Sequence, residues 1–328
     1  MSCPKWPKRF EQAKAQGKHI QNFFREFLGN FISERTRLSY LRDLATFSGF
    51  LAMGGEKLSH PSEIRSYHLS LYRDWMMEQG LAPATVGRRM VAVRSFVKWA
   101  LGQKLIDHDP LQAVKLPKVQ TLSPTVAFDD DEVRSMIDAP DVETFSGNTH
   151  RLVLVLLFYL GPRRAELAQI KMEDIVKERG HTALLIHGKG GKKRLVPLSE
   201  AVMEEIEAYG KRLSSLTGRT LEGGDFLIQT DRKGKNLRPC DGSTIYRIVK
   251  RYAAGLGITK RVGAHSCRAT VISHLLDTQK RPIRDVADFA GHRQTSTTER
   301  YDKKRKGLDD SAAYEVDYFE RASDPKRV

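Results

Sequence analysis

Just after the first hundred residues, three proline-containing dipeptides constrain the fold of this chain more than any other feature. Asp109-Pro110, Leu116-Pro117 and Ser123-Pro124 fall within residues 107–125. A proline lacks a backbone donor and keeps the preceding residue out of the helical conformation, so no helix runs through this segment. No alternation of apolar and polar residues replaces it with a strand. The chain has 328 residues, enough for two domains, and we predict an extended linker between them over residues 109–126.

The residues before the linker predict a domain of packed helices over 19–108. Apolar side chains recur there at three- and four-residue steps in four stretches, which cover residues 20–28, 34–53, 64–80 and 83–101. Helices that each have one apolar face pack into a small bundle. Residues 1–18 precede this bundle as an N-terminal extension.

The residues after the linker predict a domain of helices and short strands over 127–306. Asp129 to Glu132 fit the start of a helix, and residues 150–160 are apolar enough to form a buried one. Two strands of a hairpin are expected at 182–187 and 193–198, and a further extended piece at 225–229. Other helices are expected at about 242–256, 264–276, 282–290, around Tyr301, and at 311–321 within a C-terminal tail of residues 307–328. The predicted fold class is mainly α with a small β-sheet in the C-terminal domain.

The charge of the chain indicates a polyanionic partner. Lys and Arg number 55 against 40 Asp and Glu, which gives a formal net charge of +15 and a pI near 9.7. A membrane surface is the competing polyanion, but no basic amphipathic helix or acylation signal supports it. The longest apolar run, Leu152–Leu160, is far below the ~20 residues that cross a bilayer, and the N-terminus has no secretory signal. We therefore expect nucleic acid as the partner, no membrane association, and a cytoplasmic, nucleoid-associated location.

Metal and disulfide chemistry are not expected. Cys3, Cys240 and Cys267 lie far apart without a CxxC pair, and none of the ten histidines belongs to an HExxH motif. We predict no metal and no other cofactor.

The third expected helix of the N-terminal domain carries a basic face. Residues 1–118 hold 19 Lys and Arg against 10 Asp and Glu, whereas the remaining 210 residues hold 36 against 30. This density favours a surface that grips phosphates, although a solvated face is the simpler interpretation of one such helix. The candidate DNA-contacting residues on it are Arg88, Arg89, Arg94 and Lys98.

Two basic segments of the second domain could bind an anion. Gly161-Pro162-Arg163-Arg164 follows an apolar helix, and an arginine there must find an anion because its guanidinium is never discharged; an internal ion pair with Glu166 is the alternative. The expected hairpin turn carries Lys189, Lys192, Lys193 and Arg194 among glycines that let a phosphate approach the backbone. Cations at a hairpin tip are also commonly just solvated.

Three further side chains stand in suggestive positions near the C-terminus. His265 and Arg268 are three residues apart, which places both on one face of a helix. His292 follows Gly291, and Tyr301 lies nine residues later. Each of these features is weak alone.

In order, Arg163, Lys189, His265, Arg268, Gly291-His292 and Tyr301 resemble the motifs of the tyrosine recombinases, the phage integrase family, and most closely its short, two-domain Xer-type enzymes. The similarity covers nearly the whole chain. It extends to Arg194-Leu195-Val196-Pro197-Leu198 after the hairpin and to Ser296-Thr297-Thr298 before Tyr301.

The resemblance implies a helical, SAM-like core-binding domain and a mixed α+β catalytic domain that close around double-stranded DNA. It implies site-specific recombination, by integration, excision or resolution, in a tetramer assembled on two DNA sites. Tyr301 would attack phosphorus and form a 3′-phosphotyrosyl intermediate. Arg163 and Arg268 would stabilise the transition state, Lys189 would protonate the leaving 5′-oxygen, and His265 and His292 would bind the phosphate oxygens or take the proton of the nucleophile.

The chain departs from the family pattern at a few places. Pro162 stands in the turn before Arg163, and Arg164 leaves open which arginine reaches the phosphate. Phe289-Ala290 replaces the usual Leu-Leu before Gly291-His292. The extension and the variant arginine segment lean toward a mobile genetic element. A type IB-like topoisomerase and a catalytically inactive DNA-binding regulator are the alternatives, and the C-terminal tail is a possible protomer-exchange helix.

Overall fold

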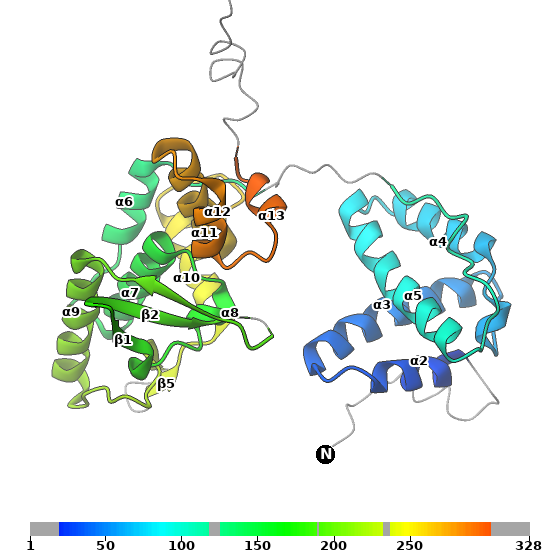
Figure 1. Cartoon of the computed structure of the whole chain (residues 1–328), viewed down its shortest axis with the longest axis horizontal. Coiled ribbons are helices and arrows are strands. Elements are labelled where there is room, and N and C mark those ends of the chain that lie inside the picture. Colours follow the sequence, from blue (N-terminus) through cyan, green and yellow to red (C-terminus); the bar gives the residue numbers. More distant parts are fainter. Residues whose placement is uncertain (1–19, 118–124, 189, 232–236, 303–328) are drawn as a thin grey trace, which may run out of the picture. The chain divides into compact units, whose positions relative to one another are not determined.

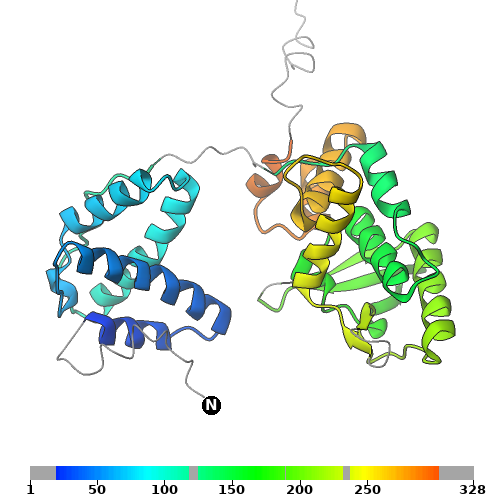
Figure 2. The ribbon, with the colours of Figure 1, turned by 180° about the vertical axis from the view of Figure 1, so that it is seen from behind.

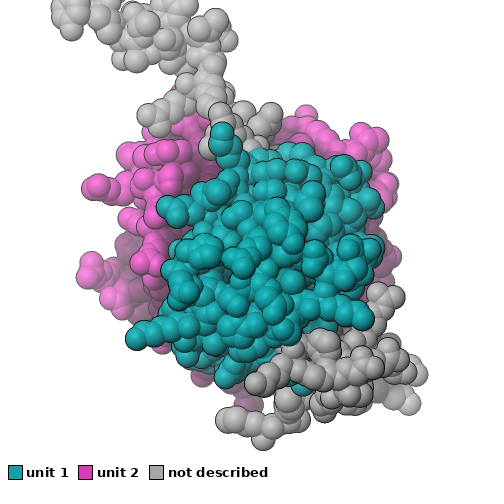
Figure 3. Space-filling model, turned by 90° about the vertical axis from the view of Figure 1, so that its right-hand side faces the viewer, with its two compact units in different colours: residues 1–120 teal, residues 121–328 magenta. Residues whose placement is uncertain are grey.

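The computed structural model describes residues 20–117, 125–188, 190–231 and 237–302 of the chain. The chain divides into two compact units, which consist of residues 1–120 and 121–328 (Figure 3). Each is described here by itself.

The first unit is the expected helical bundle. Its helices, drawn in blue to cyan in Figure 1, are α2 (Ile20–Gly29), α3 (Glu34–Met53), the 3₁₀ turn η2 (Pro61–Glu63), α4 (Ser66–Glu78) and α5 (Pro83–Gly102). Ser33 starts α3, because its hydroxyl accepts a hydrogen bond from the backbone of Thr36 at 3.4 Å. The core is aromatic, with Phe24 and Phe96 in an edge-to-face pair.

The first part of the expected linker belongs to this bundle. Leu111 and Val114 are buried in its core, and Leu116 packs against the same cluster. The prediction of an extended segment beginning at 109 is therefore wrong for residues 109–117. The prolines do prevent a helix, but the apolar residues between them still pack against the bundle. Residues 118–124 lie outside the described residues.

The second unit contains a three-stranded antiparallel sheet among helices (Figures 1 and 2). The strands are β1 (Ile175–Glu178), β2 (His181–His187) and β3 (Lys193–Pro197), in the order β1-β2-β3, with Ile186 opposite Arg194. A second, two-stranded sheet pairs β4 (Gln229–Asp231) with β5 (Leu237–Pro239). The helices before and after the main sheet are α6 (Asp130–Asp138), α7 (Phe145–Leu160), α8 (Arg164–Leu167), η3 (Met172–Asp174), α9 (Glu200–Thr217), α10 (Gly242–Gly255), α11 (Ala264–Ser273), η4 (His274–Thr278), α12 (Ile283–Ala290) and α13 (Thr295–Glu299).

The central helix α7 is longer than the apolar run that predicted it. The hydroxyl of Thr144 accepts from the backbone of Gly147 at 3.0 Å and starts the helix at Phe145. Gly161 ends it with a φ of 54°, the left-handed conformation that glycine adopts without strain. The turn after α7 consequently directs Arg163 and Arg164 away from the core.

Strand β1 and helix α9 are among the elements that were not anticipated. Helix α9 has a clear signal in its sequence, because Val202, Ile206, Tyr209 and Leu213 are buried at steps of four and three. Strand β1 has only four residues, of which none is buried, and so gives almost no apolar pattern. The helix expected at 311–321 lies outside the described residues.

Candidate active site

At the C-terminal end of α12, three successive backbone carbonyls each accept a hydrogen bond from a different arginine. Arg194 donates to Phe289 at 3.1 Å, Arg268 donates to Ala290, and Arg163 donates to Gly291 at 3.1 Å. The arginines come from β3, α11 and the turn before α8. The end of a helix carries partial negative charge, so it stabilises cations placed there. The three guanidinium groups are thus gathered beside the loop that carries His292.

Glu166 is the carboxylate that shares this cluster. Its Oε1 accepts from Arg163 Nη1 at 2.6 Å, and its Oε2 accepts from Arg194 Nη2 at 2.9 Å and from the backbone N–H of Arg163 at 2.9 Å. Burial works to raise the pKa of Glu166, but the hydrogen bonds from Arg194 and Arg163 outweigh it and lower the pKa to about 2. Glu166 is therefore ionised and compensates one of the three positive charges.

The geometry separates the roles of Arg163 and Arg164. The side chain of Arg163 is 41% exposed, so it reaches solvent while it bonds to Glu166 and to Gly291. Arg164 turns to α10 instead, where its guanidinium lies over the ring of Tyr246 at 6.0 Å and against Gly242. Of the two, Arg163 is the one that joins the cluster.

Arg268 lies deeper than the other two. It is 1% exposed, and it donates to Gly161 at 2.6 Å as well as to Ala290. Burial, together with the charge of Arg163, lowers the pKa of Arg268 to about 10. The group therefore remains charged at neutral pH, held between two turns of the chain.

Tyr301 and His265 form a direct contact. The hydroxyl oxygen of Tyr301 lies 3.0 Å from Nε2 of His265. Burial, with the nearby charges of Arg268 and Arg163, lowers the pKa of His265, so the ring is neutral at neutral pH. Burial raises the pKa of Tyr301, against the opposing effect of the same two arginines. A neutral imidazole nitrogen thus faces a protonated phenol at hydrogen-bond distance.

The second histidine supports the tyrosine ring from the other side. The His292 ring stacks on Tyr301, with centroids 6.1 Å apart and planes 11° from parallel. Its Nδ1 is 2.8 Å from the hydroxyl of Thr298, which is fully buried. Burial and the charge of Arg268 lower the pKa of His292 to about 4. The backbone oxygen of Tyr301 accepts a hydrogen bond from the hydroxyl of Ser273 on α11, which fixes the segment around Tyr301 to that helix.

The hairpin between β2 and β3 closes against this cluster. A Cβ placed on Gly188 would lie 3.7 Å from Oε1 of Glu166, and the Gly188 backbone N–H donates to Lys192 at 2.6 Å. Gly190 and Gly191 both have a φ of 76°, a conformation that favours glycine. Lys189, which lies between Gly188 and Gly190 in the sequence, falls outside the described residues.

The predicted DNA contacts of this hairpin divide into two kinds. Lys192 and Lys193 are exposed and remain available to a phosphate. Arg194 is not, because its side chain is only 12% exposed and bonds to Glu166 and Phe289. The geometry therefore does not support Arg194 as a DNA contact.

Comparison with known proteins gives the family. Residues 127–307 match the phage integrase family, and residues 20–104 match its N-terminal SAM-like domain. The chain belongs to the phage integrase family.

Relatives and solved structures agree with this assignment. The tyrosine recombinase XerC of Myxococcus xanthus is 34% identical over 275 residues, which are 82% of this chain and 87% of the relative. XerD of Staphylococcus haemolyticus is 30% identical over 273 residues, or 82% of this chain and 88% of the relative. The XerH site-specific recombinase bound to a palindromic difH substrate shares the fold, with a TM-score of 0.66, 20% identity and 95% of each chain covered.

The predicted family, fold class and enzyme class of this tyrosine recombinase are confirmed. The chain is a site-specific DNA recombinase, and the comparisons give no support to a topoisomerase or an inactive regulator. Of the six catalytic candidates, the structure brings five together and does not describe Lys189. Two residues that were not catalytic candidates, Thr298 and Ser273, also bond to this site. Thr298 belongs to the Ser296-Thr297-Thr298 segment noted in the sequence, whereas the sequence around Ser273 gives no such signal.

The N-terminal candidates of the recombinase lie on α5 and differ in their surroundings. Arg88 donates two hydrogen bonds to the carboxylate of Asp43, from Nη1 to Oδ2 at 2.6 Å and from Nη2 to Oδ1 at 3.0 Å. Asp43 is only 4% exposed. Arg89 and Arg94 are half-buried, whereas Lys98 is exposed. Arg88 therefore has a structural task in addition to any contact with DNA.

The described residues offer neither a metal site nor a membrane-spanning helix. They hold no group of three or more His, Cys, Asp and Glu side chains that could bind a metal ion. Within the same ranges, none of the helices has the length and apolar character needed to span a bilayer.

Proposed function

We propose that this recombinase cuts and rejoins DNA with Tyr301 as nucleophile and His265 as the group that receives its proton. The observation that carries the proposal is the 3.0 Å contact between the Tyr301 hydroxyl and Nε2 of His265. This distance is within the range for direct proton transfer. The guanidinium groups of Arg268 and Arg163 both lie close enough to lower the pKa of His265 and to oppose the rise in the pKa of Tyr301 that burial causes.

Cleavage exchanges one phosphodiester for another. The Tyr301 oxygen bonds to phosphorus as its proton passes to His265, and the bond from phosphorus to the 5′-oxygen breaks. Lys189 donates a proton to that oxygen, which leaves a free 5′-hydroxyl and a 3′-phosphotyrosyl link. The reverse attack by the 5′-hydroxyl of another strand completes the exchange, so the bond energy is retained and no ATP is required.

The guanidinium groups stabilise the charge that accumulates on the non-bridging oxygens. Arg163 and Arg268 are preorganised for this by carbonyls and by Glu166, so they need no rearrangement when charge develops. His292 contributes a hydrogen bond to the same oxygens. When the Thr298 hydroxyl donates to its Nδ1, the neutral ring carries its proton on Nε2, where it serves as a donor.

The partner is double-stranded DNA, and the working assembly is a tetramer on two sites. Lambda integrase, which shares this fold with a TM-score of 0.67 at 15% identity, covering 93% of this chain and 83% of its own, has been seen as a tetramer bound to a Holliday junction. The net charge of +15 supports a polyanionic partner. Arg89, Arg94, Lys98, Lys192 and Lys193 are the proposed phosphate contacts. The recombinase would act on DNA in the cytoplasm, at the nucleoid.

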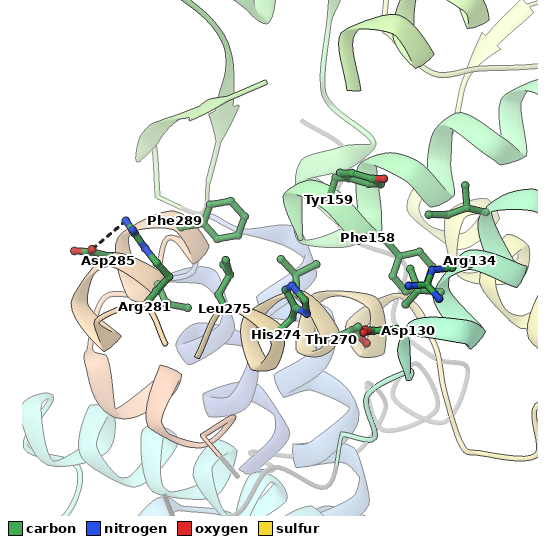
Figure 4. Close-up of a pocket in the computed structure, with 14 residues that line it drawn as sticks. Asp130, Arg134, Phe158, Tyr159, Thr270, His274, Leu275, Arg281, Asp285 and Phe289 are labelled. Atoms are coloured by element: carbon green, nitrogen blue, oxygen red, sulfur yellow. Dashed lines mark hydrogen bonds and ion pairs between the residues drawn. The ribbon is translucent and has the colours of Figure 1, made fainter. Parts of the chain in front are cut away.

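A cavity of about 600 Å³ supports a role for the tail in this assembly (Figure 4). Figure 4 shows Phe158 and Tyr159 on one side of it, and Leu275 and Phe289 on the other. Its wall also includes Val286, which packs in the same cluster as Tyr301. The tail after Gly307 carries the apolar residues Val316 and Phe319 in its sequence, and we propose that the tail of a neighbouring copy binds at this cavity.

Truncation after Gly307 tests the tail. Single-site DNA binding, measured by gel shift, should be retained, whereas synapsis and strand exchange between two sites should be lost. Recombination by the truncated protein at the wild-type rate would contradict this role. Loss of single-site affinity would instead indicate that the tail acts within its own subunit.

A covalent trapping assay tests the proposed chemistry. On a nicked suicide substrate the cleaved fragment escapes, so a recombinase accumulates as a protein–DNA adduct that survives denaturation. The adduct should resist phosphatase and disappear on proteolysis. Absence of an adduct under conditions where the protein binds the site would contradict the proposed function.

A further inference from the structure

Arg194 is mostly buried, whereas the neighbouring Lys192 and Lys193 are exposed. It lies on β3, two and four residues before Val196 and Leu198, which are both buried. Alternate residues of a strand point to the same face, so Arg194 belongs to the inward face of the sheet. The exposed residues Lys193 and Leu195 belong to the other face.

The side chain of Arg194 joins two parts of the active site. Its Nη2 donates to Oε2 of Glu166 at 2.9 Å, and its Nε donates to the carbonyl of Phe289 at 3.1 Å. The contact with the second part is close, because a Cβ placed on Gly291 would lie 2.9 Å from Nη1 of Arg194. Gly291 immediately precedes His292.

The charge of Arg194 also affects the partner of Arg163. Glu166 is 5% exposed and receives side-chain hydrogen bonds from both arginines, one to each oxygen. Without Arg194, Oε2 would keep only the backbone N–H of Arg163. The carboxylate would then compensate Arg163 alone, and the guanidinium of Arg163 would retain less charge for a phosphate.

We propose that Arg194 is a positioning residue for strand cleavage. It holds the hairpin that carries Lys189 at a fixed distance from the turn that carries His292, and it compensates Glu166 so that Arg163 remains available to the phosphate. The inference rests on the proposed function, in which Lys189 and Arg163 act on the scissile phosphate.

The test compares Arg194→Met and Arg194→Lys with Arg219→Met. Arg219 is a matched control, because it also bonds to a carboxylate, Asp225 at 2.6 Å, but outside the site. Single-turnover cleavage should fall by roughly 10- to 100-fold in Arg194→Met, as expected when reacting groups are misplaced by a fraction of an ångström. It should fall less in Arg194→Lys and remain unchanged in Arg219→Met. The affinity for DNA and the dependence of affinity on salt should stay at wild-type values, because no phosphate contact is lost.

Two further measurements distinguish positioning from a structural defect. A substrate with sulfur in place of the 5′-bridging oxygen needs little protonation of its leaving group, so it should recover part of the rate lost in Arg194→Met. Glu166→Gln added to Arg194→Met should recover another part, because it removes the carboxylate that would otherwise offset the charge of Arg163. The thermal midpoint of each variant shows whether it is folded, and Arg194→Lys supplies the measurement if Arg194→Met is not.

Three outcomes would overturn the proposal. The first is cleavage by Arg194→Met at the wild-type rate. The second is an equal defect on the oxygen and sulfur substrates that Glu166→Gln does not rescue. The third is a salt dependence of DNA affinity reduced by about one counterion, which would make Arg194 a phosphate contact. Failure of the proposed function gives a different result. In that case Tyr301→Phe would still form the adduct, whatever the Arg194 variants do.

Discussion

The phenol of Tyr301 and the imidazole of His265 are hydrogen-bonded within one subunit, with 3.0 Å between the hydroxyl oxygen and Nε2. The proposed nucleophile is thus within hydrogen-bond distance of the proposed proton acceptor. Tyr301 is 5% exposed, packed with Ala269, Ile272 and Val286, so its ring has a structural role as well.

Replacing Tyr301 with phenylalanine should remove the chemistry and leave the packing. Only the hydroxyl is lost, so we expect normal DNA binding by gel shift and no covalent adduct on a denaturing gel. Tyr318→Phe is the matched control and should form the adduct. If Tyr301→Phe still yields an adduct, another tyrosine, with Tyr314 and Tyr318 first in line, is the nucleophile.

The rate of cleavage should depend on the protonation of His265. The imidazole can receive a proton only when it is neutral, and its pKa is below the usual 6.5. We expect the single-turnover rate to fall as the ring becomes protonated at low pH, with the midpoint of the fall below pH 6.5. An acid limb centred at or above pH 6.5 would contradict the proposed role.

The variant His265→Gln gives the complementary test. Without a base, attack requires the tyrosinate, and the pKa of Tyr301 is raised above its usual 10. The residual rate should therefore increase with pH across the range 7–9, by up to about tenfold per unit. A residual rate that does not change with pH would show that His265 does not receive the proton of Tyr301.

Arg163 and Arg164 should differ sharply in their effect on cleavage. Arg163→Ala removes a preorganised donor, so we expect a loss of roughly 10²- to 10³-fold. Arg164→Ala removes a contact with Tyr246 and should change the rate by less than about tenfold. The cleavage rate of each variant is measured as the rate of adduct formation at saturating DNA. Equal losses in the two variants would show that Arg163 and Arg164 do not differ in their contribution to cleavage.

Lys189→Ala should slow cleavage by roughly 10²- to 10⁴-fold, the range for one acid–base group. Its defect is expected in the protonation of the leaving group, so the substrate with 5′-bridging sulfur should largely restore the rate. Equal defects on both substrates would assign Lys189 to phosphate binding instead.

Arg88→Ala should destabilise the N-terminal bundle. It would leave the carboxylate of Asp43, which is 4% exposed, without its bidentate partner. We expect a loss of about 1–3 kcal/mol in the free energy of unfolding, measured by denaturant titration. The half-exposed position of Arg88 keeps the value below that of a fully buried ion pair.

Two further variants test whether the loss of stability in Arg88→Ala comes from the unpaired Asp43. Adding Asp43→Asn should recover part of the stability, because the unpaired charge is removed, and Lys98→Ala on the same helix should have little effect on unfolding. Unchanged stability in Arg88→Ala would show that the ion pair is not stabilising, and the residue would return to the set of simple DNA contacts.

The sequence named the candidate catalytic residues, of which the structure brings five together, but it did not predict most of the bonds that hold them. Arg88 and Asp43 are 45 residues apart, and no local pattern pairs them. Arg194 was grouped with the exposed cations of the hairpin, although its spacing from Val196 and Leu198 already indicated the inward face of the strand. Helix α9 was also readable from its apolar spacing, whereas the four-residue strand β1 was not. The ion pair of Arg163 with Glu166 was one of the alternatives that the sequence offered. The carbonyls of Phe289, Ala290 and Gly291 could not be predicted as acceptors, since main-chain oxygens are present at every position.

This last feature explains how the recombinase tolerates an unusual sequence around Gly291-His292. Main-chain oxygens do not titrate and do not change with the side chain attached to them, so Phe289-Ala290 supplies the same acceptors as any other pair in that conformation. The hydrogen bonds of the arginines therefore depend on the path of the chain at residues 289 and 290 and not on which side chains these residues carry.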